Sequence, residues 1–185
     1  MRRLLQLGWR RSPPASPLLE HDLSAPTMVD QNNCNVATSG TVFCDDDVGG
    51  ANGVAYSSAT HQGEATVSWT ASQTANNCIV GFTENPTGST LPYGVDYGIR
   101  MKSDGSQIEI RGSVVGVEDP INHPVPYTTS TVFKIIYDGA TIKFYVDGVE
   151  EYSTTTLVTG NMTFHADTGF YIVGTGVENL LFGGL

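Results

Sequence analysis

The clearest pattern of apolar and polar positions lies in residues 131–152. Two runs alternate apolar with polar side chains, a period of two that is typical of strands with one face in a core. Each run ends in Asp-Gly, and this pair favours a type I′ hairpin turn because Gly adopts positive φ freely and Asp tolerates it. The segment therefore predicts three antiparallel strands joined by two tight turns. The residues that should face the core are Phe133, Ile135, Tyr137, Ile142, Phe144 and Val146.

Shorter strands are predicted on both sides of this segment. Turn residues separate them at regular intervals, which favours an antiparallel sandwich or barrel. Residues 28–58 read as loops with one or two edge strands, and the prolines of 119–126 keep that stretch out of a central ladder. Trp69 alternates with core positions and should be buried. The predicted strands are 41–43, 54–56, 64–70, 78–83, 95–101, 107–111, 114–117, 162–166, 169–173 and 177–182.

Residues 1–27 differ from the rest of the chain. An Arg-flanked apolar stretch resembles the start of a signal peptide, but it is shorter than the ~7–15 apolar residues that secretion requires. Four prolines then impose an extended course. We expect an N-terminal arm, residues 1–27, followed by one domain, residues 28–185. The arm is either a docking segment for neighbouring proteins or a disordered leader, and Met28 is an alternative natural start.

The charge of the chain is uneven. Residues 1–28 carry four Arg and two acidic side chains, a charge of +2, whereas the remainder carries five basic and seventeen acidic side chains, a charge of −12, which together give −10. An acidic body repels phosphate backbones, so nucleic acid is not an expected partner. No apolar run reaches the ~20 residues of a membrane span.

Three cysteines, Cys34, Cys44 and Cys78, cannot all pair with one another. A Cys34–Cys44 bridge would leave Cys78 alone. The favoured alternative is three reduced, mostly buried thiols, because free Cys often behaves as a small hydrophobic residue. Their spacing matches no zinc motif.

Several segments resemble the concanavalin A-like lectin/glucanase superfamily, which includes laminin-G-like, pentraxin-like and legume-lectin domains. The similarity covers residues 41–185 and is greatest to modules of virion and bacterial surface proteins. It implies a two-sheet jelly roll whose last strand pairs beside the first, and it says little about the ligand, since function lies in the loops. The matching segments are Glu64–Trp69, Ile79–Thr83, Asp96–Ile99, the hairpin Phe133–Gly148 and Glu178–Gly183.

Glycosidase activity is not expected. Retaining glucanases of the superfamily place Glu-x-Asp-x(x)-Glu on one strand, which brings two carboxylates ~5 Å apart. The nearest strand here, Gln107–Arg111, has only Glu109. Glu118 and Asp119 are adjacent, so their side chains point apart in an extended chain. We therefore predict a protein that is not an enzyme, with glycoside hydrolysis as the third alternative.

Glycan binding is the commonest non-catalytic function that the resemblance implies. Sugars bind where aromatic rings stack on them and where polar groups meet their hydroxyls. Two loops and their flanking strands offer such groups. The candidate ligand-binding residues are Tyr93, Asp96, Tyr97, Asn122, His123 and Tyr127.

An acidic loop offers a weaker candidate for a calcium site. Asp45 and Asp47 precede two glycines, and such a loop concentrates the oxygen ligands that Ca²⁺ prefers. The loop lacks EF-hand spacing, and a solvated acidic turn is the favoured alternative. No other cofactor is expected.

Two classes of function follow. The first is a lectin-like module that binds a glycan or cell-surface ligand, on a virion or extracellular surface. The second is a structural subunit of a larger assembly, such as a virion decoration or fibre protein, that docks on neighbours through residues 1–27.

Overall fold

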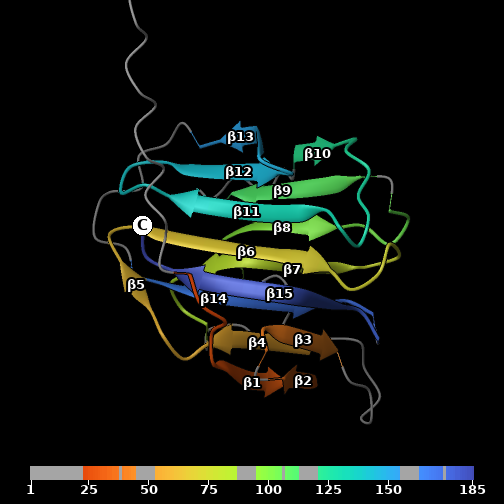
Figure 1. Cartoon of the computed structure of the whole chain (residues 1–185), viewed down its shortest axis with the longest axis horizontal. Coiled ribbons are helices and arrows are strands. Elements are labelled where there is room, and N and C mark those ends of the chain that lie inside the picture. Colours follow the sequence, from red (N-terminus) through yellow and green to blue (C-terminus); the bar gives the residue numbers. More distant parts are fainter. Residues whose placement is uncertain are drawn as a thin grey trace, which may run out of the picture.

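A computed structural model describes residues 23–37, 39–44, 53–86, 95–105, 107–112, 121–154, 163–172 and 174–185. Within these ranges the protein is all-β, with two antiparallel sheets packed face to face (Figure 1). This confirms the predicted two-sheet sandwich. No helix long and apolar enough to cross a membrane occurs in the part of the chain that the structure describes.

The rear sheet in Figure 1 has eight strands in the order β1-β4-β14-β7-β8-β9-β10, with β5 paired to β14. Its strands are β1 (Met28–Asn32), β4 (Gly53–Ser57), β5 (His61–Gln62), β7 (Cys78–Thr83), β8 (Tyr97–Met101), β9 (Ile108–Gly112), β10 (Ile121–His123) and β14 (Thr163–Phe170). The front sheet has seven strands in the order β13-β12-β11-β6-β15-β3-β2. They are β2 (Cys34–Ala37), β3 (Thr41–Cys44), β6 (Ala65–Ala71), β11 (Val132–Tyr137), β12 (Ile142–Val146), β13 (Val149–Ser153) and β15 (Gly176–Gly183).

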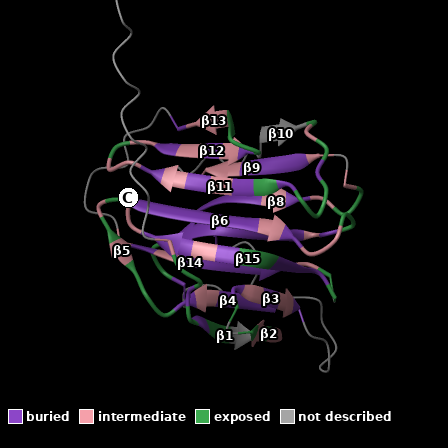
Figure 2. Ribbon diagram, in the orientation of Figure 1, coloured by how far each residue is buried: buried purple, intermediate pink, exposed green. Residues whose placement is uncertain are grey.

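The core lies between the two sheets, where the central strands are buried along most of their length (Figure 2). All six predicted core positions of 131–152 are at most 5% exposed, which confirms the alternation. Trp69 is buried as expected and stacks on Phe133 with ring centroids 5.6 Å apart. Phe82 and Tyr137 pack against Phe164 from opposite sheets, at 5.0 and 5.2 Å. Of these contacts, the one between Tyr137 and Phe164 crosses from one sheet to the other and helps hold the two layers together.

The two Asp-Gly turns differ. Asp147 and Gly148 have φ of 48° and 81°, and Val146 pairs with Val149, so this turn has the predicted type I′ conformation. At the first turn the prediction is wrong, because Tyr137 pairs with Ile142 across a four-residue loop and Asp138 has no positive φ. Instead, the Asp138 carboxylate accepts hydrogen bonds from two backbone N–H groups of this loop, those of residues 140 and 141.

Two stretches fold differently from the prediction. Residues 162–166 and 169–173 were expected as separate strands, but β14 runs unbroken from Thr163 to Phe170. Residues 28–37 were expected mainly as loops, but they form the edge strands β1 and β2. The short strand β10 is the edge strand of its sheet. This agrees with the prolines near it, because proline cannot donate a ladder hydrogen bond. The strand predicted at 114–117 lies outside the described residues.

The closing strand β15 lies beside the first residues that the structure describes. β15 pairs with β6 and with β3, the first strand predicted from the sequence. Ser24 forms a bridge with Phe182, and Pro26 is buried, so the described part of the N-terminal arm lies against the domain. Cys34 and Cys44 are opposite each other on β2 and β3, and all three cysteines are free thiols.

Candidate functional site

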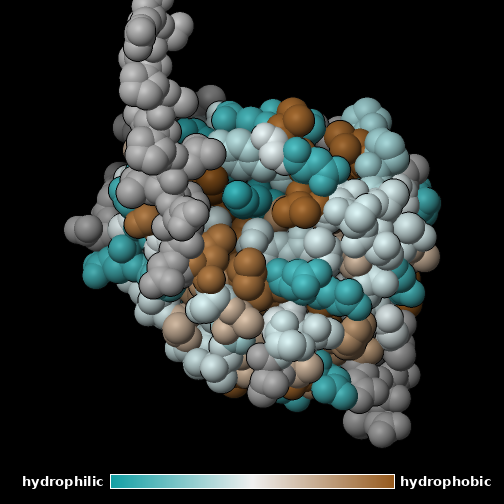
Figure 3. Space-filling view, in the orientation of Figure 1, coloured by the Kyte–Doolittle hydropathy of each residue, from teal (hydrophilic) through white to brown (hydrophobic). Residues whose placement is uncertain are grey.

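The two sheets present different outer faces to solvent. Figure 3 looks onto the seven-stranded sheet, where apolar and hydrophilic side chains are mixed, with Val132 43% exposed. The outer face of the eight-stranded sheet instead carries most of the ionisable groups of β7, β8, β9 and β14. It is therefore the more promising face for polar recognition.

One row of residues crosses this outer face from strand to strand. Tyr56 on β4 pairs with Asp167 on β14, Asp167 with Gly81 on β7, Gly81 with Gly98 on β8, and Gly98 with Arg111 on β9. Residues that are directly opposite in antiparallel strands share a face. The row thus has an acidic end at Asp167 and a basic end at Arg111, with two glycines between them.

Asp167 is the most unusual residue of the acidic end. The residue is only 2% exposed, and its Oδ1 atom has no hydrogen-bond partner. Burial raises the pKa of Asp167 to about 8, and the charge of Asp96 contributes to this rise. At neutral pH the group is therefore mainly a neutral carboxylic acid, which can donate one hydrogen bond and accept others.

The side chains of Asp96, His165 and Tyr56 lie on the same face as Asp167. Asp96 Oδ2 accepts hydrogen bonds from Thr83 Oγ1 at 3.1 Å and from the Glu84 backbone N–H at 2.9 Å. His165, opposite Thr83, donates from Nδ1 to the carbonyl oxygen of residue 57 at 2.7 Å, and its ring meets Tyr56 edge-on at 5.7 Å. The acidic end therefore combines carboxyl groups, an imidazole and a half-buried aromatic ring.

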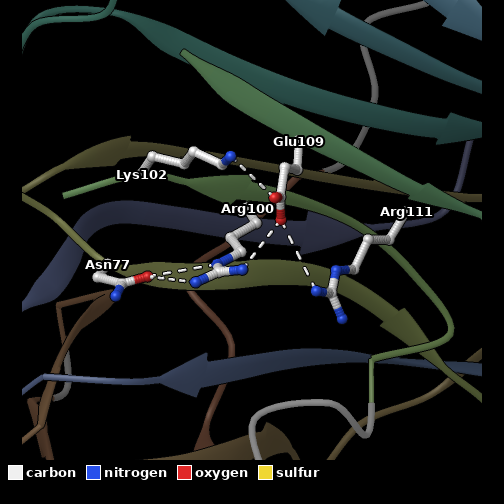
Figure 4. A network of polar contacts seen from close by, with 5 residues as sticks. All are labelled: Asn77, Arg100, Lys102, Glu109 and Arg111. Atoms are coloured by element: carbon white, nitrogen blue, oxygen red, sulfur yellow. Dashed lines mark hydrogen bonds and ion pairs between the residues drawn. The ribbon is translucent and has the colours of Figure 1, made fainter. Parts of the chain in front are cut away.

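At the basic end, three cations surround the carboxylate of Glu109 (Figure 4). Arg100 Nη1 and Lys102 Nζ each lie 3.0 Å from a Glu109 oxygen, and Arg111 Nη2 lies 3.7 Å away. Arg100 also donates to Asn77 Oδ1 through Nε and Nη2, at 3.3 and 3.2 Å. Burial would raise the pKa of Glu109, but Lys102 and Arg100 lower it overall, so this carboxylate stays ionised.

The candidates predicted from the sequence fall into three groups. Asp96 lies on the outer face, as described above. Tyr97 and Tyr127 are 6% and 3% exposed, and both rings pack in the core. The Tyr127 hydroxyl lies 2.6 and 3.0 Å from the carbonyl oxygens of Lys102 and Asn76, and burial raises the pKa of Tyr127. These two rings are therefore not placed to stack on a sugar.

Asn122 and His123 lie on β10, where their backbones pair with Glu109 and Ile108 of β9. Tyr93 and the calcium candidates Asp45 and Asp47 lie outside the described residues. Among the residues that the structure does describe, no group of three or more His, Cys, Asp or Glu side chains is arranged to hold a metal ion.

Sequence reasoning missed His165 and Asp167, and a signal for them existed. Phe164, Ala166 and Phe170 continue one alternation through the supposed break between two strands. Following that period of two would have placed both polar residues on the opposite, outward face. The basic cluster of Arg100, Lys102 and Arg111 around Glu109 was missed because Glu109 was considered only as a catalytic carboxylate.

Comparison with known proteins identifies the fold. No family model matches the chain, and no curated protein matches it. Many solved structures do. The exoplasmic/lumenal domain of VIP36, solved with Ca²⁺ and Man3GlcNAc bound, superposes with a TM-score of 0.62 at 7% identity, covering 85% of this chain and 84% of that domain.

Two bacterial structures are similar in the same way. The carbohydrate-binding module CBM66 from Bacillus subtilis has a TM-score of 0.56 at 9% identity, covering 88% of this chain and 98% of the module. The β-glucanase of Bacillus licheniformis has a TM-score of 0.53 at 16% identity, covering 84% of this chain and 83% of the enzyme. The chain therefore has the concanavalin A-like jelly-roll fold, as the resemblance implied, and binding proteins and an enzyme share that fold.

Proposed function

We propose that this protein is a non-catalytic carbohydrate-binding module and that its ligand lies on the outer face of the eight-stranded sheet. The observation that supports this most is the buried Asp167 carboxyl with an unpartnered Oδ1. Buried polar atoms are nearly always hydrogen-bonded, and leaving one unpaired costs about 1–3 kcal/mol. Because the atom is buried, a ligand hydroxyl satisfies it only if the residues above it move aside.

The chemistry around Asp167 suits a sugar. A sugar hydroxyl both donates and accepts, so it can pair with the neutral acid of Asp167 and with the carboxylate of Asp96. His165 adds an imidazole ring, which is oriented by the hydrogen bond from its Nδ1 to the carbonyl oxygen of residue 57. The Tyr56 ring is half-buried and gives an apolar surface for the C–H side of a sugar ring.

The spacing of Asp167 and Glu109 does not suit a glycosidase, although Asp96 lies closer to Asp167 and keeps hydrolysis as the alternative. Glycosidases separate their two carboxyl groups by ~5–5.5 Å or ~6.5–9.5 Å. Asp167 and Glu109 lie on β14 and β9, with β7 and β8 between them. Three strand spacings amount to about 14 Å, which is too far for either mechanism. Glu109 is also held ionised by its cations, whereas a general acid needs a raised pKa.

An extracellular or virion-surface location fits this proposal. The similar VIP36 structure is an exoplasmic/lumenal domain, and another similar structure is the carbohydrate recognition domain of Emp47p. Residues 1–27 would then attach the domain to neighbouring proteins. Deleting residues 1–22 tests that role: loss of assembly with unchanged glycan binding supports it, and unchanged assembly contradicts it.

The binding proposal is tested by a glycan array followed by NMR titration of the hits. We expect shifts at Tyr56, Asp96 and His165, and loss of binding in Asp167→Ala. Glu178→Gln, which changes an exposed carboxyl of the seven-stranded sheet, should bind normally. An array without hits, together with unchanged spectra at these positions, would remove the proposal.

A further inference from the structure

Cys34 and Cys44 lie directly opposite each other on the antiparallel strands β2 and β3. Their backbone N–H groups point away from each other, because that of Cys34 donates to Asp30 Oδ1 at 3.1 Å and that of Cys44 donates to the carbonyl oxygen of Thr175 at 2.9 Å. The two cysteines are therefore a non-hydrogen-bonded pair, in which opposite Cα atoms are about 4.5 Å apart. This spacing is within the ~4.4–6.8 Å that a disulfide requires.

The sulfur atoms of both cysteines lie beside Gly53 of β4. The Sγ of Cys34 and the Sγ of Cys44 are 3.0 and 3.1 Å from the position that a Cβ atom at Gly53 would occupy. The two sulfurs are therefore no further apart than these two distances taken together. A methyl group at residue 53 would press on both of them, so the glycine leaves a space that the two thiols share.

Cys78 is not placed to compete for either sulfur. It lies on β7 of the eight-stranded sheet, whereas Cys34 and Cys44 belong to the seven-stranded sheet. The backbones of packed sheets are about 10 Å apart, which exceeds the ~7 Å Cα separation beyond which a disulfide cannot form. Within the eight-stranded sheet, Phe170 separates Cys78 from Gly53. Cys78 should therefore remain a thiol when the other two are oxidised.

The two opposed thiols differ in their access to solvent. Cys44 is 2% exposed, whereas Cys34 is half-buried and lines a cavity of about 400 Å³ beside residues 25–28. An oxidant therefore reaches Cys34 first. Burial and the nearby charge of Asp30 raise the pKa of the Cys34 thiol, so little of it is the reactive thiolate at neutral pH. Oxidation should be slow in the folded domain and faster while the chain is still folding.

We infer that Cys34 and Cys44 form a disulfide in an oxidising environment. The Cys34 thiolate attacks a sulfur of a low-molecular-mass disulfide, oxidised glutathione, and one glutathione thiolate leaves. The Cys44 thiolate then attacks the Cys34 sulfur of this mixed disulfide, and the second glutathione thiolate leaves. The protein loses two electrons to the oxidant, and its two thiol protons end on the two glutathione molecules.

The bond would fasten β2, the last strand of its sheet, to β3. It closes a loop from residue 34 to residue 44, and such a cross-link stabilises the fold mainly by restricting the unfolded chain. Disulfides persist on extracellular and virion surfaces and are rare in the reducing cytosol. The inference thus agrees with the proposed location. It does not depend on carbohydrate binding, because neither sulfur belongs to the candidate site.

The test refolds the full chain from urea at about pH 8, with either oxidised glutathione or a reductant present. Thiols are then counted by alkylation in urea and mass spectrometry. We expect three alkyl groups on the reduced protein and one, on Cys78, on the oxidised monomer. The melting temperature of the oxidised monomer should be higher by roughly 5–10 °C. Cys34→Ala and Cys44→Ala should each abolish both differences, whereas Cys78→Ala should keep the difference in melting temperature.

Three results would overturn the inference. The first is a monomer that still takes up three alkyl groups after oxidative refolding. The second is glutathione that stays attached to Cys34, or a bond that joins two chains, because either means that Cys44 does not reach the Cys34 sulfur. The third is a bridged monomer that melts no higher than the reduced one. A glycan array on the same samples tests carbohydrate binding separately, so either proposal can fail alone.

Discussion

The raised pKa of Asp167 predicts how the stability of the protein depends on pH. In the unfolded chain an Asp side chain titrates near ~3.9, whereas burial raises the pKa of Asp167 in the folded protein to about 8. Between these values the folded state binds one proton more than the unfolded state. Raising the pH therefore destabilises the protein through this group, by about 1.4 kcal/mol per pH unit, from near pH 4 until the folded-state pKa is passed.

Asp167→Asn isolates this contribution, because the amide has the shape of the neutral acid and does not titrate. The free energy of unfolding of the variant minus that of the wild type should grow with pH between about 4.5 and 7.5, by about 1.4 kcal/mol per unit, and level off above pH 8. Urea unfolding at six pH values measures both proteins. Glu178→Gln serves as the control, and its difference from the wild type should stay small.

Two parallel stability curves would refute this reasoning. They would mean that Asp167 titrates at an ordinary pKa, with solvent or a partner group around Oδ1. The argument for a ligand hydroxyl at this position would then lose its main support. A ligand that binds the neutral acid should also bind less tightly above pH 8, which gives an independent check in the binding assay.

Three further predictions concern the hairpin and the acidic loop. Phe144→Ala should cost about 3–5 kcal/mol in urea unfolding, because the ring is fully buried. Although burial raises it, hydrogen bonds from Lys143 and the loop hold the pKa of Asp138 below its usual range, so Asp138→Ala should cost about 1–3 kcal/mol at pH 7 and less as the pH falls below 4. Chelator or added calcium should leave the melting temperature unchanged, and a calcium-dependent rise that Asp45→Asn and Asp47→Asn abolish would contradict this.

The sequence predicted those parts of the fold that depend on local patterns. The alternation in 131–152 identified the core face of the hairpin, because each side chain's burial follows from its position in the strand. The conformation of the first turn could not be predicted from Asp-Gly alone. Asp138 can either adopt positive φ or accept backbone hydrogen bonds, and the contacts to residues 140, 141 and 143 decide between them.

The candidate site depends on contacts that are not local. Asp96 and Asp167 are 71 positions apart in the chain, and only the pairing of β14, β7 and β8 places them on one face. The basic cluster depends on the register of β8 and β9, which sets Arg100 opposite Glu109. Sequence reasoning found Asp96 through its loop, but it had no means of pairing this residue with β14.

The outer face of the eight-stranded sheet is more charged than a purely structural sheet requires. Replacing a buried ion pair by apolar residues is often neutral or stabilising, so the fold alone does not call for Glu109 and its three cations. Burying Asp167 lowers the stability of the fold still more, because one of its buried oxygens has no hydrogen-bond partner. Such groups persist most readily where a ligand uses them. A structural subunit would tolerate Asp167→Leu, whereas a binding module that kept its fold would lose its ligand.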